Sequence, residues 1–261
     1  MKSIFISTPC YGGNVSMSYT ISILNLLIKL NEKNINFVID FLGNESLIVR
    51  ARNKALAKFI NSNFTHILFI DSDIEFPAEA VIDLLEFDKD ITGCVYPRKG
   101  INFKRLLFSL QNEPNSKESI ESRGLDFCFN NLNDNENIIK EGNFIRVKET
   151  STGFMMVKKD IVLKMIEKNK YLQVIDDSMD SNMNNSYYAL FNCIIDTDKR
   201  FLSEDYSFCK RASESGGEIW INTKHDLSHL GTYSFKSNIS NRENLTRSIN
   251  EKIFYEKNIN N

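Results

Sequence analysis

The first hundred residues alternate between short apolar runs and longer segments with helical periodicity, and this alternation limits the fold more than any other feature. Short apolar runs predict strands, and apolar residues three or four positions apart predict helices. The predicted strands are Ser3–Ser7, Asn36–Phe41, His66–Ile70 and Asp90–Tyr96, and the predicted helices are Ser16–Leu30, Ser46–Phe59 and Pro77–Leu85. This order is typical of an α/β domain with a mostly parallel central sheet flanked by helices. Ligands of such sheets bind beyond the carboxyl ends of the strands.

The second half of the chain is less regular. Residues 112–143 are polar and predict an insertion or loop region. Beyond it, the predicted strands are Phe144–Val147, Gly153–Val157 and Glu218–Ile221, and the predicted helices are Ile161–Glu167 and Ser203–Ser215. The polar stretch Asp176–Ser186 predicts a mobile loop, and the end of the chain predicts an amphipathic helix with a polar tail.

Charge and cysteine content exclude several classes of protein. The chain has 32 Lys and Arg against 34 Asp and Glu, so it lacks the positive excess of nucleic-acid-binding proteins, and we expect no nucleic-acid partner. Its five cysteines are odd in number and form no CxxC pair, which is typical of reduced thiols in the cytoplasm. The sequence shows no signal peptide and no apolar run of membrane-spanning length. We therefore expect a soluble, cytoplasmic protein without a transmembrane segment.

Two carboxylates follow the most apolar predicted strand. Asp71 and Asp73 come directly after HILFI, so both emerge at the carboxyl end of a strand that we expect to be central. Carboxylates at this spacing can both reach a hard divalent cation, which can bridge the phosphates of a nucleotide diphosphate. The alternative is an ordinary turn with exposed acids at the end of a strand.

A second acidic group opens the predicted helix at Ser203. Glu204 and Asp205 lie in its first turn, where a carboxylate can serve as a general base towards an acceptor hydroxyl. Acids in a first turn also stabilise a helix through its dipole, so a purely structural role stays open. Ser203 is the predicted N-cap.

Histidines and cations complete the list of candidate groups. His229 is a candidate metal ligand, because neutral imidazole commonly binds divalent metals, although a lone histidine is more often structural. His225 is expected at the surface and His66 in the core. Arg52 lies on the predicted helix that precedes the Asp-x-Asp strand, and Lys99 follows the fourth predicted strand. Either can contact a nucleotide or its phosphates, or can lie on a solvated surface.

The order of these motifs resembles a known family. Along the chain they are TPCYGG, RARN, LFIDSDIEF, GCVYP, STGFMMVKK, SEDYSFCKR and LSHLG, from about residue 3 to residue 235. This order is similar to small glycosyltransferases of the GT-A type, close to family 2 and to relatives in bacteria, phages and large viruses. The resemblance implies a Rossmann-like, mostly parallel sheet with a smaller acceptor-side sheet. It implies one domain over residues 1–261: a nucleotide-sugar-binding half (1–100), an acceptor and catalytic half (101–235), and a helix and tail (236–261).

The resemblance also implies a role for each matching residue. On the donor side, Thr8, Pro9 and Tyr11 would line the base pocket, and Arg52, Asp71 and Lys99 would contact the nucleotide. Asp71, Asp73 and His229 would hold Mn²⁺ or Mg²⁺, with Asp73 as the direct ligand. On the acceptor side, Thr152, Gly153 and Phe154 would form a wall. Asp205 would be the base of an inverting transfer, with Glu204 beside it.

The sequence departs from family 2 at two points. The second strand lacks the consecutive acidic pair that often binds the base there, and Asp40 and Glu45 are weak substitutes. No QxxRW motif is present, so a single transfer is expected in place of polymerisation. We expect a UDP-sugar as donor, with GDP-sugars second. A glycan, a lipid-linked molecule and a protein side chain all remain open as acceptor, and the 176–186 loop is a candidate lid.

Other classes fit the sequence less well. A haloacid-dehalogenase-like phosphatase also places Asp-x-Asp after a strand, but after the first strand and with a hydroxyl residue following. A sugar-nucleotide-forming nucleotidyltransferase needs a Gly-rich, Arg-containing loop, which YGGN matches poorly. A non-catalytic GT-A-like binding module remains an open alternative.

Overall fold

The computed structural model describes residues 2–115, 119–132, 138–175 and 186–233. Residues Met1–Leu230 form one compact unit, and Gly231–Asn261 form a second. Residues 176–185 of the predicted mobile loop (Asp176–Ser186) and the predicted carboxyl-terminal helix lie outside the described residues. No helix among the described residues is long and apolar enough to cross a membrane.

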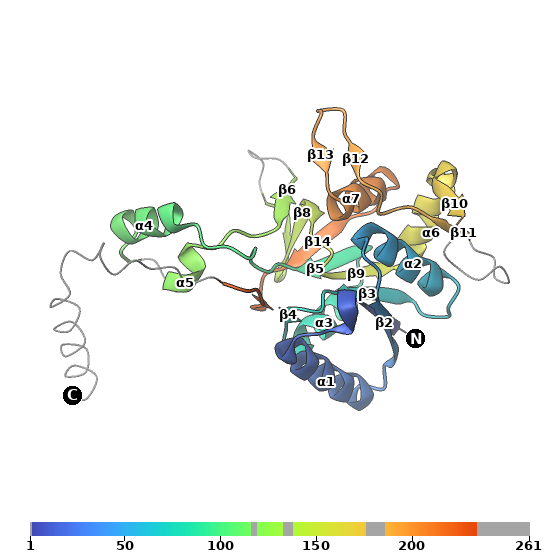
Figure 1. Cartoon of the computed structure of the whole chain (residues 1–261), viewed down its shortest axis with the longest axis horizontal. Helices are drawn as coiled ribbons and strands as arrows, with labels where there is room; N and C mark the ends of the chain where they lie inside the picture. Colours follow the sequence, from blue (N-terminus) through green and yellow to red (C-terminus); the bar gives the residue numbers. More distant parts are fainter. Residues whose placement is uncertain (1, 116–118, 133–137, 176–185, 234–261) are drawn as a thin grey trace. The chain divides into compact units, whose positions relative to one another are not determined.

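A nine-stranded mixed sheet forms the centre of the first unit, counted over the described residues (Figure 1). In spatial order its strands are β2 (Asn36–Gly43), β1 (Ser3–Cys10), β3 (His66–Ile70), β9 (Phe154–Lys158), β5 (Ile91–Cys94), β14 (Ile219–Asn222), β8 (Phe144–Thr150) and β6 (Phe129–Asn131), and β7 (Lys140–Glu141) pairs with β8. The strands β2, β1 and β3 are parallel, as are β5 and β14. β9 lies antiparallel between β3 and β5, and β8 is antiparallel to β14.

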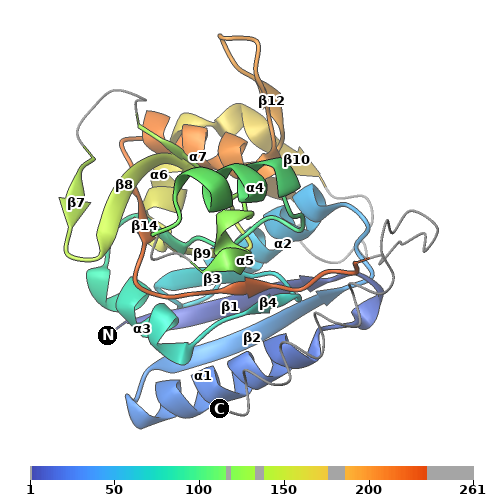
Figure 2. The same ribbon diagram turned by 90° about the vertical axis from the view of Figure 1, so that its left-hand side faces the viewer.

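Helices cover both faces of this sheet, which confirms the predicted α/β class (Figure 2). One face packs against α1 (Met17–Glu32) and α3 (Ala78–Phe87), and the other against α2 (Ile48–Ile60), α6 (Lys159–Lys168) and α7 (Glu204–Glu214). Alternation along β1 produces the two layers, since Ile4 and Ile6 belong to one core cluster and Phe5 to the other. The buried strand β3 contributes to both layers at the centre of the molecule.

The remaining elements are short. They are the 3-10 helices η1 (Tyr11–Gly13) and η2 (Lys170–Leu172), the helices α4 (Phe103–Asn112) and α5 (Ile120–Arg123), and the strands β4 (Ile74–Glu75), β10 (Gln173–Ile175), β11 (Ser186–Tyr188), β12 (Ile194–Ile195), β13 (Phe201–Leu202) and β15 (Ser228–His229). Residues 112–143, predicted to be an insertion or loop region, contain the short elements α5, β6 and β7, and β6 and β7 join the main sheet.

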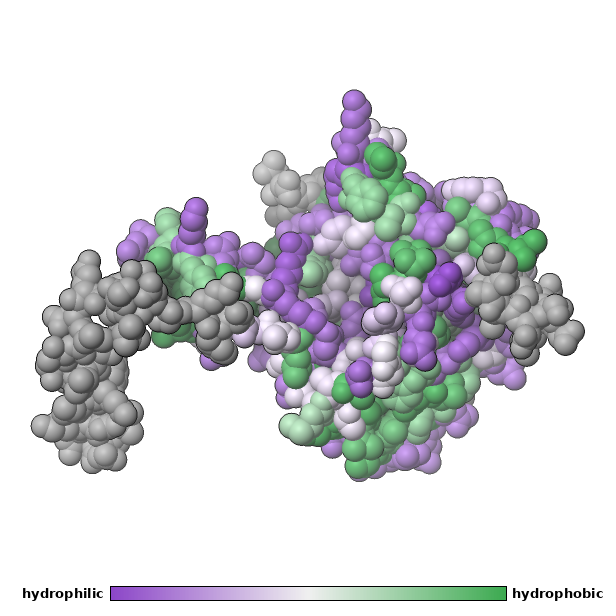
Figure 3. All heavy atoms as spheres, viewed as in Figure 1, coloured by the Kyte–Doolittle hydropathy of each residue, from purple (hydrophilic) through white to green (hydrophobic). Residues whose placement is uncertain are grey.

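The apolar spacing that predicts helix α1 does not mark its buried face. Of the four residues with this spacing, Ile21, Leu24 and Ile28 are 52%, 54% and 59% exposed, whereas Leu27 is partly buried against the core. The face that packs into the core instead carries Tyr19, Ile23, Leu26 and Leu30. Apolar side chains therefore occupy both sides of α1, and an apolar surface lies over this helix in Figure 3. Periodicity alone cannot choose between two apolar faces of one helix.

Candidate active site

A cavity of about 420 Å³ opens at the carboxyl ends of β1 and β3. It is lined by Pro9, Tyr11, Glu45, Ser46, Ile48, Arg52, Asp71, Ser72, Asp73, Lys99, Glu204 and His229. Eight of these were singled out from the sequence as donor, metal or catalytic candidates: Pro9, Tyr11, Arg52, Asp71, Asp73, Lys99, Glu204 and His229. The fold thus brings together residues that are up to 220 positions apart in the chain (229 − 9).

The turn after β3 holds the first carboxylate of the Asp-x-Asp pair in place. The backbone N–H of Asp71 donates to the carbonyl of Gly153 at 2.9 Å, and the N–H of Ile74 donates to the Asp71 carbonyl at 3.2 Å. A β-carbon on Gly153 would lie 2.6 Å from Asp71 Oδ2 and would also clash with the hydroxyl of Tyr96. Only glycine therefore allows the Asp71 carboxylate this close to the β8–β9 connection.

Arg52 ties this carboxylate to the start of α7. Its Nη2 donates to Asp71 Oδ1 at 3.2 Å, and its Nη1 donates to Glu204 Oε1 at 2.6 Å. The guanidinium is buried, with 4% of the residue exposed. Burial alone would lower the pKa of Arg52, but Asp71 and Glu204 outweigh it and raise the pKa. Arg52 thus braces two acids of the cavity, whereas the sequence resemblance implied a contact with the nucleotide.

Asp73 has different partners at the same cavity. Lys99 Nζ donates to Asp73 Oδ2, and His229 Nε2 lies 3.5 Å from Asp73 Oδ1. The short strand β15 pairs with β4 and sets His229 opposite Ile74, while the N–H of Leu230 donates to the Asp73 carbonyl at 2.9 Å. Burial would raise the pKa of Asp73, but hydrogen bonds from His229 and Lys99 lower it to about 2.

The tautomer of His229 follows from its second contact. Its Nδ1 lies 2.9 Å from the carbonyl oxygen of Pro97, which can only accept a hydrogen bond. Nδ1 therefore carries a proton. The nitrogen that faces Asp73, Nε2, donates to that carboxylate only in the protonated ring, and in the neutral ring it carries the lone pair that could bind a cation. A carbonyl that orients the far nitrogen in this way is typical of metal-binding histidines.

The described residues contain no group of three or more His, Cys, Asp or Glu side chains that could hold a metal ion. Asp71 is turned towards Arg52, which leaves Asp73 and His229 as the adjacent pair of potential ligands. Mg²⁺ in nucleotide sites is commonly held by one or two carboxylates together with phosphate oxygens. Asp73 and His229 therefore fit a divalent cation provided that phosphate oxygens of a bound nucleotide supply the remaining ligands.

The other sequence candidates do not line the cavity. Thr152 and Phe154 are fully buried beneath it, and Thr8 is buried with its hydroxyl 2.6 Å from that of Tyr19. Asp205 accepts hydrogen bonds from the Ser203 hydroxyl and, at 2.8 Å, from the Tyr206 N–H. The acid of α7 that faces the cavity is Glu204.

Several lining residues were missed by the sequence analysis. Ser46 and Ile48 had no motif to mark them. Glu45 was only a weak candidate, and its carboxylate accepts from Arg50 at 2.6 and 2.7 Å. Tyr96 does not line the cavity but contacts residues beside it: it is 5% exposed, accepts from the Gly153 N–H at 3.0 Å and packs edge-on against the His229 ring. Its place just after β5 was the one signal that could have drawn attention to it.

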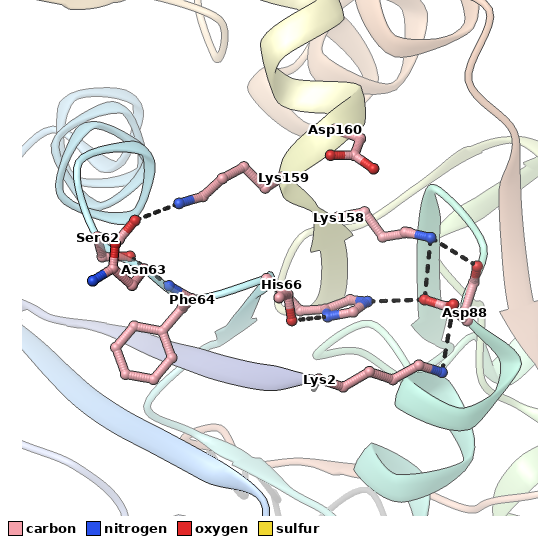
Figure 4. Close-up of a pocket in the computed structure, with 10 residues that line it drawn as sticks. Lys2, Ser62, Asn63, Phe64, His66, Asp88, Lys158, Lys159 and Asp160 are labelled. Carbon is pink, nitrogen blue, oxygen red and sulfur yellow. Dashed lines mark hydrogen bonds and ion pairs between the residues drawn. The ribbon is translucent and has the colours of Figure 1, made fainter.

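A larger cavity of about 600 Å³ lies at the opposite edge of the sheet (Figure 4). There Lys2, Lys158 and His66 converge on the carboxylate of Asp88, at 3.5, 3.2 and 3.2 Å. Asp88 ends α3 in a left-handed conformation (φ 56°), and His66 is buried as predicted, with 3% exposed. His225 is also engaged away from the candidate site, with Nε2 2.8 Å from Asp83 Oδ2.

No protein-family model matches the chain, and no curated protein matches it. Among solved structures it is similar to the crystal structure of A197 from STIV, with 14% identity, 92% of this chain and 100% of that chain covered, and a TM-score of 0.47. It is also similar to the crystal structure of GalNAc-T7 with UDP, GalNAc and Mn²⁺, with 8% identity and a TM-score of 0.46. That match covers 89% of this chain and 44% of the other. Both likenesses are distant, and neither assigns a function to this chain.

Proposed function

We propose that this chain is a metal-dependent glycosyltransferase that moves a sugar from a nucleotide diphosphate sugar, with UDP-sugars favoured, to a hydroxyl acceptor. The observation that carries the proposal is the gathering of eight residues, selected from the sequence before the fold was known, around one cavity at the carboxyl edge of the sheet. That edge is where α/β sheets bind their ligands. A volume of about 420 Å³ lies within the usual range of small-molecule sites.

The charges of the cavity suit a diphosphate only together with a cation. Glu45 pairs with Arg50 and lies 3.6 Å from Lys54, and Asp71, Asp73 and Glu204 face Arg52 and Lys99. The cations of the chain are thus already matched by its carboxylates, which leaves no excess positive charge for a bare diphosphate. A divalent ion on Asp73 and His229 would add that charge and, when bound, would stabilise the charge that develops on the departing diphosphate.

The chain's own residues supply the remaining tasks. Tyr11, which is 74% exposed, and Pro9 line the cavity and would offer a ring face and an apolar surface to a base. Arg52 keeps Asp71 and Glu204 in fixed positions through the start of α7. An acid of that helix turn, Asp205 by the sequence resemblance or Glu204 by its place at the cavity, would accept the proton of the acceptor hydroxyl.

A phosphatase mechanism suits this geometry less well. In such an enzyme Asp71 would be the nucleophile and would need a free carboxylate oxygen. Here Arg52 binds Oδ1, and Oδ2 is packed against Gly153. A non-catalytic module that binds nucleotide but transfers nothing remains the alternative that experiment has to separate.

A thermal-shift panel tests the donor class. The protein is heated with UDP, GDP, CDP or dTDP, each with Mn²⁺ or with EDTA. A ligand at 100 times its Kd adds about 2.7 kcal/mol, which raises the melting temperature by a few degrees. Stabilisation by one nucleotide, and only with Mn²⁺, supports the proposal, and no stabilisation by any of them contradicts it.

Two variants then separate catalysis from binding. Asp205→Asn and Glu204→Gln each keep the size of the side chain and remove a candidate base. The variant that removes the base should lose about 100-fold or more in transfer rate and still bind the nucleotide. Unchanged transfer in both variants would exclude a base on this helix turn, and nucleotide binding without any transfer in the wild type would favour the non-catalytic module.

A further inference from the structure

Lys99 stands where a metal ion would approach Asp73. Its ammonium group contacts Asp73 Oδ2, while His229 faces the other carboxylate oxygen of Asp73. The side chains of Asp73 and Lys99 are 32% and 41% exposed, so the pair lies at the mouth of the cavity and not in its floor. In the free protein, a cation of the chain itself thus neutralises the carboxylate that a divalent ion would need.

We propose that Lys99 is an internal counter-cation, which occupies Asp73 in the free protein and moves to the diphosphate when a nucleotide binds. The inference rests on the proposed function. It predicts that metal and nucleotide bind cooperatively, because the nucleotide draws Lys99 away and exposes Asp73 to the metal. Cooperativity of this kind is a free-energy coupling between two ligands and acts equally in both directions.

The backbone around Lys99 is fixed, so only its side chain has to move. Pro97 forms a bridge to Phe127 and accepts a hydrogen bond from His229, and the Arg98 N–H donates to Asp126 at 2.8 Å. The lysine side chain is a flexible four-carbon stem with a single charge at its end. Phosphate oxygens within reach of that stem would offer it a second anionic partner in the same cavity.

Arg52 cannot act as an exchangeable cation in the way proposed for Lys99. It is 4% exposed and holds Asp71 and Glu204 at the same time, so its release would leave two acids of the cavity unpaired. Lys99 has one carboxylate partner among the described residues and lies nearer to solvent. The two cations of the cavity therefore differ in kind, with Arg52 as a fixed brace and Lys99 as an exchangeable charge.

The inference predicts opposite effects of one substitution on two ligands. Removing the charge in Lys99→Met frees Asp73, so Mn²⁺ without nucleotide should bind at least about tenfold more tightly. The same variant lacks the charge that would contact the phosphates, so UDP in the presence of Mn²⁺ should bind more weakly. A residue that merely supports the fold would weaken both.

The test measures free Mn²⁺ by electron paramagnetic resonance, with and without UDP, in the full chain. It compares the wild type, Lys99→Met and the control Lys158→Met, which removes a lysine from an aspartate at the opposite edge of the sheet. Tighter Mn²⁺ binding and smaller coupling in Lys99→Met alone are the expected results. Equal Mn²⁺ affinity and equal coupling in the wild type and Lys99→Met would overturn the inference and leave the proposed function intact. A wild type that binds neither Mn²⁺ nor UDP would overturn both.

Discussion

Two aspartates at opposite edges of the sheet are each held by lysine and histidine, and their surroundings differ. Asp88 ends α3 and is shared by Lys2, Lys158 and His66, so three basic groups surround one acid. Among the described residues, Asp73 has Lys99 and His229 as its basic partners, and it lies beside other acids in the smaller cavity. The Asp88 group has more basic groups than acids, and it joins Lys2, which precedes β1, to the ends of β3, α3 and β9. Asp73 instead lies among the other carboxylates that line the candidate site, Glu45, Asp71 and Glu204.

The two groups also differ in what their partners do elsewhere. Lys2 donates to the carbonyl of Leu85 at 2.8 Å, and His66 is buried against Thr65, with Nδ1 2.8 Å from the hydroxyl oxygen. These contacts fix the Asp88 group within the fold. Lys99 has no comparable second contact among the described residues, and His229 presents a nitrogen to the cavity. Similar residue types therefore form a structural tie at one edge and a candidate ligand site at the other.

The largest stability effect should come from the brace of the candidate site. Arg52→Met leaves Asp71 and Glu204 without their shared cation and should destabilise the protein by about 3 kcal/mol. Lys158→Met at the other edge should cost less than about 1 kcal/mol, because Lys2 and His66 still hold Asp88 and the pair is partly exposed. Urea unfolding measures both. Equal losses of unfolding free energy in Arg52→Met and Lys158→Met would contradict the view that Arg52 braces the candidate site more strongly than Lys158 holds Asp88.

A backbone substitution should move the candidate site without touching a charge. Gly153→Ala places a β-carbon 2.6 Å from Asp71 Oδ2 and should cost about 1–3 kcal/mol as the carboxylate and Tyr96 are displaced. Gly100→Ala is the matched control, because a β-carbon there meets nothing within 4 Å. Thermal unfolding and Mn²⁺-dependent nucleotide binding are measured for both. Unchanged binding in Gly153→Ala would show that the position of Asp71 is not critical.

The smallest expected effect is on the pH dependence of stability, through His66 beside Asp88. Burial lowers the pKa of His66 below its usual 6.5, so the folded protein holds this ring neutral where the unfolded chain protonates it. Stability should therefore fall as the pH drops below about 6.5, and the loss should level off below the folded pKa. His66→Gln should flatten this slope in urea unfolding at several pH values. If stability depends on pH equally in His66→Gln and the wild type, the pH dependence belongs to another titratable group.

Part of the fold could be predicted from the sequence because burial leaves a local signal. β3 spans His66–Ile70 as expected, since a short run that is apolar except for His66 and lies between polar residues predicts a buried strand. α4 was missed because only Ser109 of its residues is buried, so its helical pattern reflects little packing. On α1 the apolar residues Ile21, Leu24 and Ile28 are exposed, so a helical pattern is present there without marking the buried face.

The candidate site, like the fold, could be predicted from the sequence only in part. Asp71, Asp73 and His229 could be selected because residue type and position after a strand are visible in the sequence. Their partners could not be selected in this way. The pairing of Arg52 with Glu204 spans 152 residues, and the place of Lys99 at Asp73 depends on how β5 and β3 lie in the sheet. Contacts of this kind are fixed by the tertiary fold and leave no trace in local pattern.

The most direct test of the account compares the two aspartates in one binding experiment. Melting temperatures of the wild type, Asp73→Asn and Asp88→Asn are measured with UDP and Mn²⁺ and again with EDTA. The account predicts that the wild type and Asp88→Asn gain the same metal-dependent stabilisation, about 2.7 kcal/mol at 100 times Kd, and that Asp73→Asn gains none. Full stabilisation of Asp73→Asn, or loss of the effect in Asp88→Asn alone, would contradict the assignment of the ligand site to the Asp73 cavity.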